Sequence, residues 1–104
     1  MKNILVIVTA KDKKEAEKIA QALLKNKLVA CANIISGASS FFWWNKKIDN
    51  TKEFILFLKT KRSLFGKLTK VVKALHSYEV PEIIAVPIVA GDKNYMDWLN
   101  GNLR

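Results

Sequence analysis

Cysteine, histidine, glycine and proline are scarce in this chain of 104 residues, which has one cysteine, one histidine, four glycines and two prolines. A single cysteine excludes a disulfide framework within the chain and favours a reducing compartment. The lone histidine leaves no Ser/His/Asp triad, and the scattered glycines form no phosphate-binding loop. We therefore predict a protein that acts by binding and is not an enzyme.

Long apolar runs and acidic side chains are lacking as well. No apolar run approaches the roughly 20 residues of a membrane-spanning helix, and the amino-terminal residues show no signal-peptide pattern. We therefore predict a soluble, cytoplasmic protein without a membrane partner. The chain has nine acidic and eighteen basic residues, which gives a formal net charge of +9. This excess disfavours bulk metal storage by carboxylates and is compatible with a nucleic acid, a small anion or simply a lysine-rich composition.

What the chain does have is an apolar and aromatic stretch at residues 30–61, which predicts a very long β-hairpin around a turn at residues 45–47. Each arm would be roughly 45 Å long at about 3.3 Å per residue, longer than a compact domain of this size is wide. The arms would then overhang the domain, and a second copy of the chain is the expected cover for their edges. The alternative is a hairpin that is broken by a bulge at residues 36–37 and folded back on itself.

Helical periodicity predicts two helices and a shorter third one. The first spans residues 12–26, where Asp12 begins a capping-box pattern before an apolar stripe. The second begins at Ser63 as its N-cap and ends near His76. The third follows Asp92.

Apolar, β-branched runs predict two more strands, at residues 3–9 and 83–89. Pro87 cannot donate to a sheet ladder, which predicts that the last strand lies on an edge. The order β-α-β-β-α-β with a terminal helix predicts one α+β domain over residues 1–104, with a four-stranded antiparallel sheet and helices on one face. The hairpins of partner subunits would cover the open face of the sheet.

Several segments together are similar to those of one known family. In order they are ACANI at residues 30–34, the two tryptophans at 43–44, LKT at 58–60, HSYEVPEI at 76–83 and YMDWL at 95–99. This series resembles the CutA divalent-cation tolerance proteins over nearly the whole chain. The resemblance implies a ferredoxin-like sandwich with a long hairpin and a carboxy-terminal helix, a homotrimer and a cytoplasmic location. It also implies a role in tolerance to copper and other divalent metal ions, with no obligatory cofactor.

The chain departs from the family pattern at a few positions. Family members commonly have glycine where Lys46 stands, so Lys46 needs an unusual backbone angle or a different turn. They commonly have proline where Ser77 stands. The positions of the copper ligands attributed to some bacterial members are occupied here by Val8, Leu75 and His76, which leaves only the histidine.

His76 and Glu79 are the candidate ligands for copper or another divalent metal. A tight site needs three or four ligands, so His76 would require copies related by a threefold axis or a carboxylate such as Glu79. The alternative for His76 is a capping or polar interface residue at a helix end. Cys31 could serve soft Cu(I), but its surroundings are more typical of a small buried hydrophobe.

A small-ligand cleft between subunits is the second predicted site. Lys59 and Thr60 end the second arm of the hairpin, and Tyr78 and Glu79 begin the loop after the second helix. If a trimer brings these residues together, a small anion or a metal–anion pair would suit the cleft. The remaining aromatic candidates are assigned to the trimer interface, and they are Phe41, Phe42, Trp43, Trp44 and Trp98.

Two other functions compete with metal or small-ligand binding. The trimer could be a signalling scaffold that anchors a partner protein. A nucleic-acid-binding module is disfavoured, because RNA-recognition domains place aromatic residues on both central strands and residues 3–9 contain none.

Overall fold

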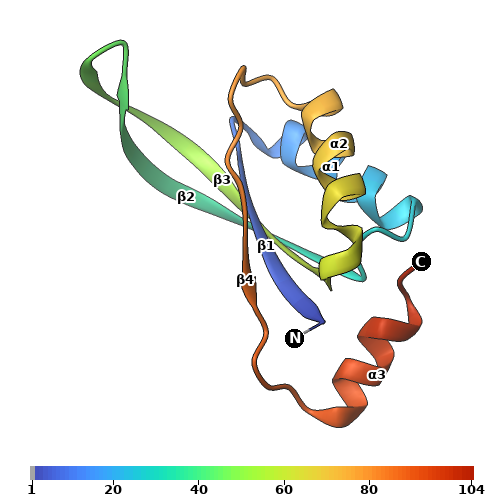
Figure 1. Ribbon diagram of the computed structural model, residues 1–104. Helices are drawn as coiled ribbons and strands as arrows, with labels where there is room; N and C mark the ends of the chain where they lie inside the picture. Colours follow the sequence, from blue (N-terminus) through green and yellow to red (C-terminus); the bar gives the residue numbers. More distant parts are fainter. Residues whose placement is uncertain (1) are drawn as a thin grey trace.

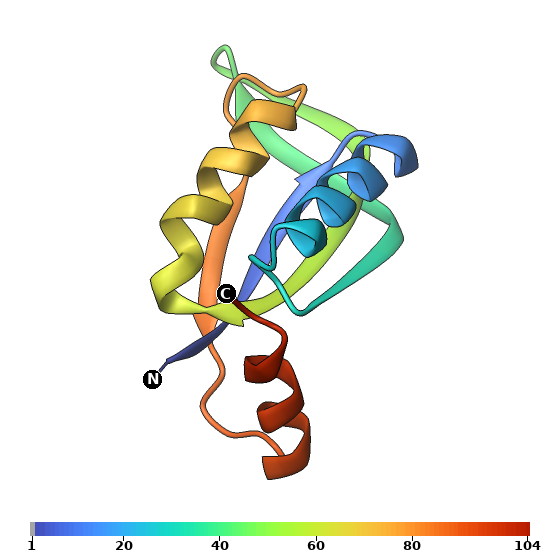
Figure 2. The same ribbon diagram turned by 90° about the vertical axis from the view of Figure 1, so that its right-hand side faces the viewer.

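A computed structural model describes residues 2–104 and shows an α+β fold in which a four-stranded sheet carries two helices on one face (Figures 1 and 2). The strands are β1 (Asn3–Ala10), β2 (Cys31–Trp44), β3 (Lys47–Lys61) and β4 (Ile83–Pro87). The sheet order is β2-β3-β1-β4, and each neighbouring pair is antiparallel. This order confirms the predicted element pattern and the edge position of the strand that contains Pro87.

The two helices on the sheet are α1 (Lys13–Lys25) and α2 (Phe65–Leu75). Each forms because an apolar stripe at helical spacing packs on the sheet. The predicted cap of α1 is confirmed, since the side chain of Asp12 accepts a 2.8 Å hydrogen bond from a first-turn N–H. The predicted cap of α2 is wrong. Ser63 lies inside a 3₁₀ turn, η1 (Arg62–Leu64), and this tighter turn leads into α2 without a side-chain cap.

The third helix, α3 (Lys93–Gly101), lies at the end of the sheet where β1 begins (Figure 1). Asp92 caps it as predicted, and the side chains of Asn3 and Asn100 join it to β1 through a 2.9 Å hydrogen bond. Among residues 2–104, no helix combines the length and the apolar character needed to cross a membrane.

The core lies between β1, β3 and the two helices on the sheet. Val6 and Val8 of β1 and Leu56 and Leu58 of β3 are fully buried there, in contact with the helix stripes. Alternate residues face the core because side chains along a strand point to opposite faces. The carboxy-terminal half of β3 is therefore anchored, while its first half extends beyond the helices.

The hairpin of β2 and β3 overhangs the sheet as predicted (Figure 1). The molecule measures 45 × 25 × 23 Å along its principal axes. A bulge shifts the register between Ile35 and Ala38, with Gly37 at a φ of +87°. Pairing resumes after the bulge and continues to the turn. The alternative of a hairpin folded back at residues 36–37 is therefore wrong.

The turn at the tip has two residues, because Trp44 pairs directly with Lys47. Asn45 and Lys46 have φ angles of +51° and +64°, as a type I′ hairpin turn requires. The predicted turn at residues 45–47 is thus one residue too long, and Lys46 takes the unusual backbone angle that the family resemblance implied.

Candidate functional site

A groove of about 750 Å³ lies between the hairpin and the loop that joins α2 to β4. Hairpin residues 40–44, 49, 51 and 53 line one side, and residues 78–80 and 82 line the other, with Thr9 of β1 also in contact. In Figure 1 the hairpin tip is green and the loop is orange. This groove brings together residues from β1, both arms of the hairpin and the loop.

The groove is acidic, although the chain as a whole is basic. Its lining carboxylates are Asp49, Glu53, Glu79 and Glu82, and no lysine, arginine or histidine among residues 2–104 lines it. Four of the nine acidic residues therefore gather here, in a chain whose formal net charge is +9. The local field attracts cations, while the rest of the surface repels them.

The tip of the hairpin has two faces of different character. Residues directly opposite each other on antiparallel strands share a face, so Phe42 lies on the same face as Asp49. Trp44, two residues from Phe42, shares that face, and Phe41 and Trp43 lie on the other one. The exposed fractions agree, at 39% and 47% for Phe42 and Trp44 against 71% and 72% for Phe41 and Trp43.

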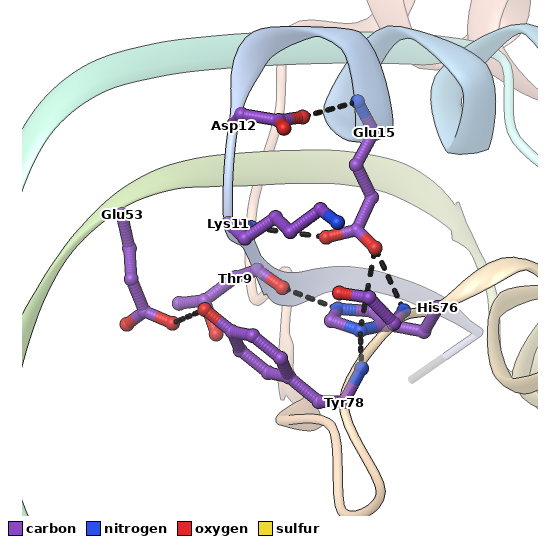
Figure 3. Close-up of polar contacts among 8 residues, drawn as sticks. Thr9, Lys11, Asp12, Glu15, Glu53, His76 and Tyr78 are labelled. Atoms are coloured by element: carbon purple, nitrogen blue, oxygen red, sulfur yellow. Dashed lines mark hydrogen bonds and ion pairs between the residues drawn. The ribbon is translucent and has the colours of Figure 1, made fainter.

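Glu53 is the most buried of the four carboxylates, with 7% of its surface exposed. Its Oε2 accepts a 2.7 Å hydrogen bond from the hydroxyl of Tyr78 (Figure 3). Its Oε1 has no partner within residues 2–104, and no basic side chain there forms an ion pair with it. Burial and the carboxylate of Glu53 raise the pKa of Tyr78, so the phenol stays protonated and its hydroxyl donates the hydrogen bond to Glu53.

Both ring nitrogens of His76 are engaged, and its side chain is fully buried. The backbone N–H of Tyr78 donates to Nδ1 at 3.1 Å, so Nδ1 carries no proton, and Nε2 donates to the carbonyl of Thr9 at 2.6 Å (Figure 3). A metal would need one of these nitrogens. This geometry fits the alternative role of a polar residue at a helix end, and it leaves no free nitrogen for copper within one chain.

Glu15 connects α1 to the loop that follows α2. Its carboxylate accepts hydrogen bonds from the backbone N–H groups of Lys11 at 2.9 Å and Ser77 at 2.7 Å (Figure 3). Burial acts to raise the pKa of Glu15, but these bonds and one from the Ser77 hydroxyl outweigh it and hold the pKa below its usual value. A proline at position 77 could not donate the backbone bond. The departure at Ser77 thus adds a contact that fixes the loop.

Metal ligands do not converge in one chain. Among residues 2–104, no group of three or more His, Cys, Asp or Glu side chains is placed to hold a metal ion. Glu79 is exposed at the groove, whereas His76 is buried beside it. The residues present therefore do not fit a metal centre built by a single chain.

The residues predicted for a cleft between subunits do not meet within one chain. Tyr78 and Glu79 line the groove. Lys59 lies six residues beyond Glu53 on β3, roughly 20 Å away at about 3.3 Å per residue. Thr60 is farther still, so only a neighbouring chain could bring the two pairs together.

Lys59 and Thr60 have other contacts at their end of the sheet. The Nζ of Lys59 lies 3.2 Å from the hydroxyl of Tyr95 and 5.5 Å from the centre of its ring. Thr60 is fully buried, and its hydroxyl donates a 2.6 Å hydrogen bond to the carbonyl of Leu28. The hydroxyl of Thr60 is therefore committed to the backbone in one chain, and its role in a cleft between subunits stays a prediction.

The groove includes acidic residues that the sequence prediction missed, namely Asp49, Glu53 and Glu82. A signal for two of them was present. Asp49, Thr51 and Glu53 alternate along the second arm, which places all three on one face of a strand. No local sequence pattern indicates that these residues lie close to residues 78–82.

Comparisons with known proteins agree on one family. The family model described as CutA1 divalent ion tolerance protein matches residues 4–102. A rice relative named Protein CutA 1, chloroplastic, is 41% identical over 98% of this chain, which spans 58% of that protein's length. The structure of the divalent cation tolerance protein (Cut A1) from Thermus thermophilus matches with a TM-score of 0.96 and 40% identity, covering 98% of this chain and 99% of that one. The CutA structure from Archaeoglobus fulgidus matches with a TM-score of 0.95 and 41% identity, covering 98% and 99%.

These comparisons overturn the predicted cytoplasmic location. The rice relative is named as chloroplastic, and the Archaeoglobus protein is described as periplasmic. The prediction was wrong because one cysteine and the lack of a long apolar run do not distinguish the cytoplasm from these compartments. Since the family model covers residues 4–102 and the relatives are 40% to 41% identical over nearly the whole chain, this chain belongs to the CutA1 divalent ion tolerance protein family.

Proposed function

We propose that this chain serves in tolerance to divalent cations, that it acts by binding and not by catalysis, and that it works as a homotrimer. The observation that supports the first point is membership of the CutA1 family over residues 4–102. The relatives from Thermus and Archaeoglobus are named as divalent cation tolerance proteins.

The helix-free face of the sheet supports the proposed assembly. It presents the apolar side chains of Ile35, Ile84 and Val86, all of which are exposed in one chain. An apolar sheet face of this kind is normally covered by another element or another chain. Three copies of the long hairpin would provide that cover, together with the exposed aromatic side chains of the tip.

Copper or another divalent ion is the proposed ligand. Since one chain brings no three ligands together among its described residues, a tight site requires carboxylates from more than one chain, with Glu79 as the first candidate. This arrangement would make metal binding depend on the assembled form.

Two measurements on the purified protein test this proposal. Light scattering should give the mass of three chains, and a monomer would overturn the assembly. Calorimetric titration with Cu(II) and with Zn(II) should show saturable binding that is weakened in Glu79→Gln. Glu17→Gln, on the exposed face of α1, is the matched control. If the trimer binds neither ion, direct metal handling is excluded.

A further inference from the structure

We propose that the outer face of α1 and α2 binds the phosphate backbone of a nucleic-acid duplex, without regard to base sequence. This goes beyond the proposed tolerance function, because it concerns another face of the molecule and an anionic macromolecule. It does not involve the sheet face that RNA-recognition domains use, which the sequence disfavours. The main support is the uneven division of charge between the helices and the rest of the chain.

The positive charge of the chain is concentrated on the helices. Together α1, η1 and α2 make up little more than a quarter of the residues, yet they hold eight of the eighteen basic side chains and two of the nine acidic ones. These elements therefore contribute +6 of the formal net charge of +9. A lysine-rich composition alone would spread its charge over all elements of the fold.

Six lysines make this face, and all of them are exposed. On both helices they lie at helical spacing on the side away from the apolar stripe that packs on the sheet. The helices lie side by side, so the two rows of lysines form one surface (Figure 2). The six are Lys14, Lys18 and Lys25 of α1 and Lys67, Lys70 and Lys73 of α2.

The charge of this face is not compensated by acidic side chains. Glu17 is exposed on α1, whereas the carboxylate of Glu15 is buried and accepts backbone hydrogen bonds from Lys11 and Ser77. Within residues 2–104, no basic side chain of α1, η1 or α2 forms an ion pair. Like charges three or four residues apart destabilise a helix. A bound polyanion would therefore relieve repulsion within each row.

The proposed assembly leaves this face open. Partner hairpins would cover the helix-free face of the sheet, and α1 and α2 lie on the opposite face (Figure 1). The acidic groove is not lined by any residue of the two helices. A duplex could therefore approach the lysines without displacing a neighbouring chain.

The composition of the face favours a duplex backbone over other anionic partners. Leu24 is the only large apolar side chain exposed on α1, η1 or α2, whereas membrane-surface helices need an apolar face. Protein interfaces are enriched in aromatic residues and depleted in lysine, and single strands bind by stacking on aromatic rings. No aromatic side chain is exposed on these elements. Lysines contact duplex phosphates without reading the bases.

The test is fluorescence anisotropy of a labelled DNA duplex of about 20 base pairs, titrated with the purified protein from about 0.05 to about 0.2 M salt. Saturable binding is expected. The logarithm of the association constant should fall with the logarithm of the salt concentration at a slope of roughly −3 to −4, as for about four phosphate contacts. Two duplexes of different sequence should bind alike.

Two double variants with the same net charge locate the binding face. Lys18→Gln with Lys70→Gln should weaken binding by roughly 20-fold and make the salt slope shallower by about 2. Lys2→Gln with Lys46→Gln, at exposed positions off the helices, is the matched control and should bind within about threefold of the wild type. Glutamine has nearly the helix propensity of lysine, so both variants should fold. Light scattering should give both the same mass as the wild type.

Three results would overturn the proposal. One is the absence of saturable duplex binding at about 0.05 M salt. Another is an equal loss of affinity in the two double variants, which would show that overall charge and not the helix face attracts DNA. The third is tighter binding to phosphatidylserine vesicles than to the duplex, which would assign the face to a membrane. Because the proposed function is tested with Cu(II), Zn(II) and the Glu79 variant, its failure can be distinguished from failure here.

Discussion

The hydroxyl of Tyr78 donates a 2.7 Å hydrogen bond to Oε2 of Glu53, and this contact joins the loop after α2 to the second arm of the hairpin. The backbone N–H of Tyr78 donates to Nδ1 of His76 at the end of α2. One residue therefore links the helix layer to the overhanging hairpin. The separation of the two groove walls depends on it.

Tyr78→Phe should lower the free energy of unfolding by about 1–3 kcal/mol, because it leaves a buried carboxylate without its donor. Adding Glu53→Gln to it should cost less than the sum of the two single changes, since Tyr78→Phe removes the donor of this contact and Glu53→Gln replaces its charged acceptor with a neutral one. Urea unfolding of the two single variants and the double variant measures this. Simple additivity would show that the two side chains do not interact in solution.

Glu15→Gln should lower the free energy of unfolding at pH 7 by about 1–2 kcal/mol, because the bonds from Lys11 and Ser77 favour the charged form. The pKa of Glu15 is lower when folded than its ordinary 4.5. Its contribution is therefore fully present above pH 4.5 and is lost as the pH falls through the folded pKa. Unfolding measured from about pH 7 to about pH 3 should show the difference from wild type shrinking below that point. A constant difference would contradict the assignment.

Lys46→Gly should stabilise the fold by about 0.5–1 kcal/mol. Lys46 has a φ of +64°, where a side chain is strained and glycine is not. Part of the gain is offset by the greater freedom of glycine in the unfolded chain. Lys47→Gly is the matched control, because Lys47 begins β3 and should lose stability when it becomes glycine. Thermal unfolding of both variants decides the matter, and a loss of stability in Lys46→Gly would contradict the type I′ turn.

Trp43→Ala should weaken assembly by about 2 kcal/mol or more if this exposed side chain is a central contact between subunits. Trp44→Ala should weaken it less, since Trp44 is less exposed in one chain than Trp43, at 47% against 72%, and has less surface left to bury on assembly. Light scattering over a dilution series measures both. Equal effects would show that the two faces of the tip do not have separate roles in assembly.

The strands and helices with strong periodicity were predictable from the sequence, and so was the edge position of β4. Local patterns failed where a neighbouring element decided the outcome. Ser63 has a side chain typical of a helix cap, but it lies inside the 3₁₀ turn that follows β3 and does not cap α2. Thr60 has a side chain typical of a ligand residue, but within one chain its hydroxyl donates to the carbonyl of Leu28, a contact that no local pattern indicates.

The candidate site was predictable only in part. Tyr78 and Glu79 do line the groove, and the aromatic residues at 41–44 do lie together at the tip. The contact between Tyr78 and Glu53 joins residues 25 apart in the sequence, and neither residue shows in its local pattern that it meets the other. Only the path of the loop over the end of β1 brings them together.

The bulge at Gly37 separates the hairpin into a root and a tip, and a different feature sets the strand register in each. Before it, Ile34 pairs with Leu56, and after it Phe42 pairs with Asp49, so the pairing is offset by one residue between root and tip. The core dictates the alignment at the root, and the two-residue turn dictates the alignment at the tip. The extra residue absorbs the mismatch between them. The tip can therefore change its groove-facing residues during evolution while the root keeps the alignment that the core demands.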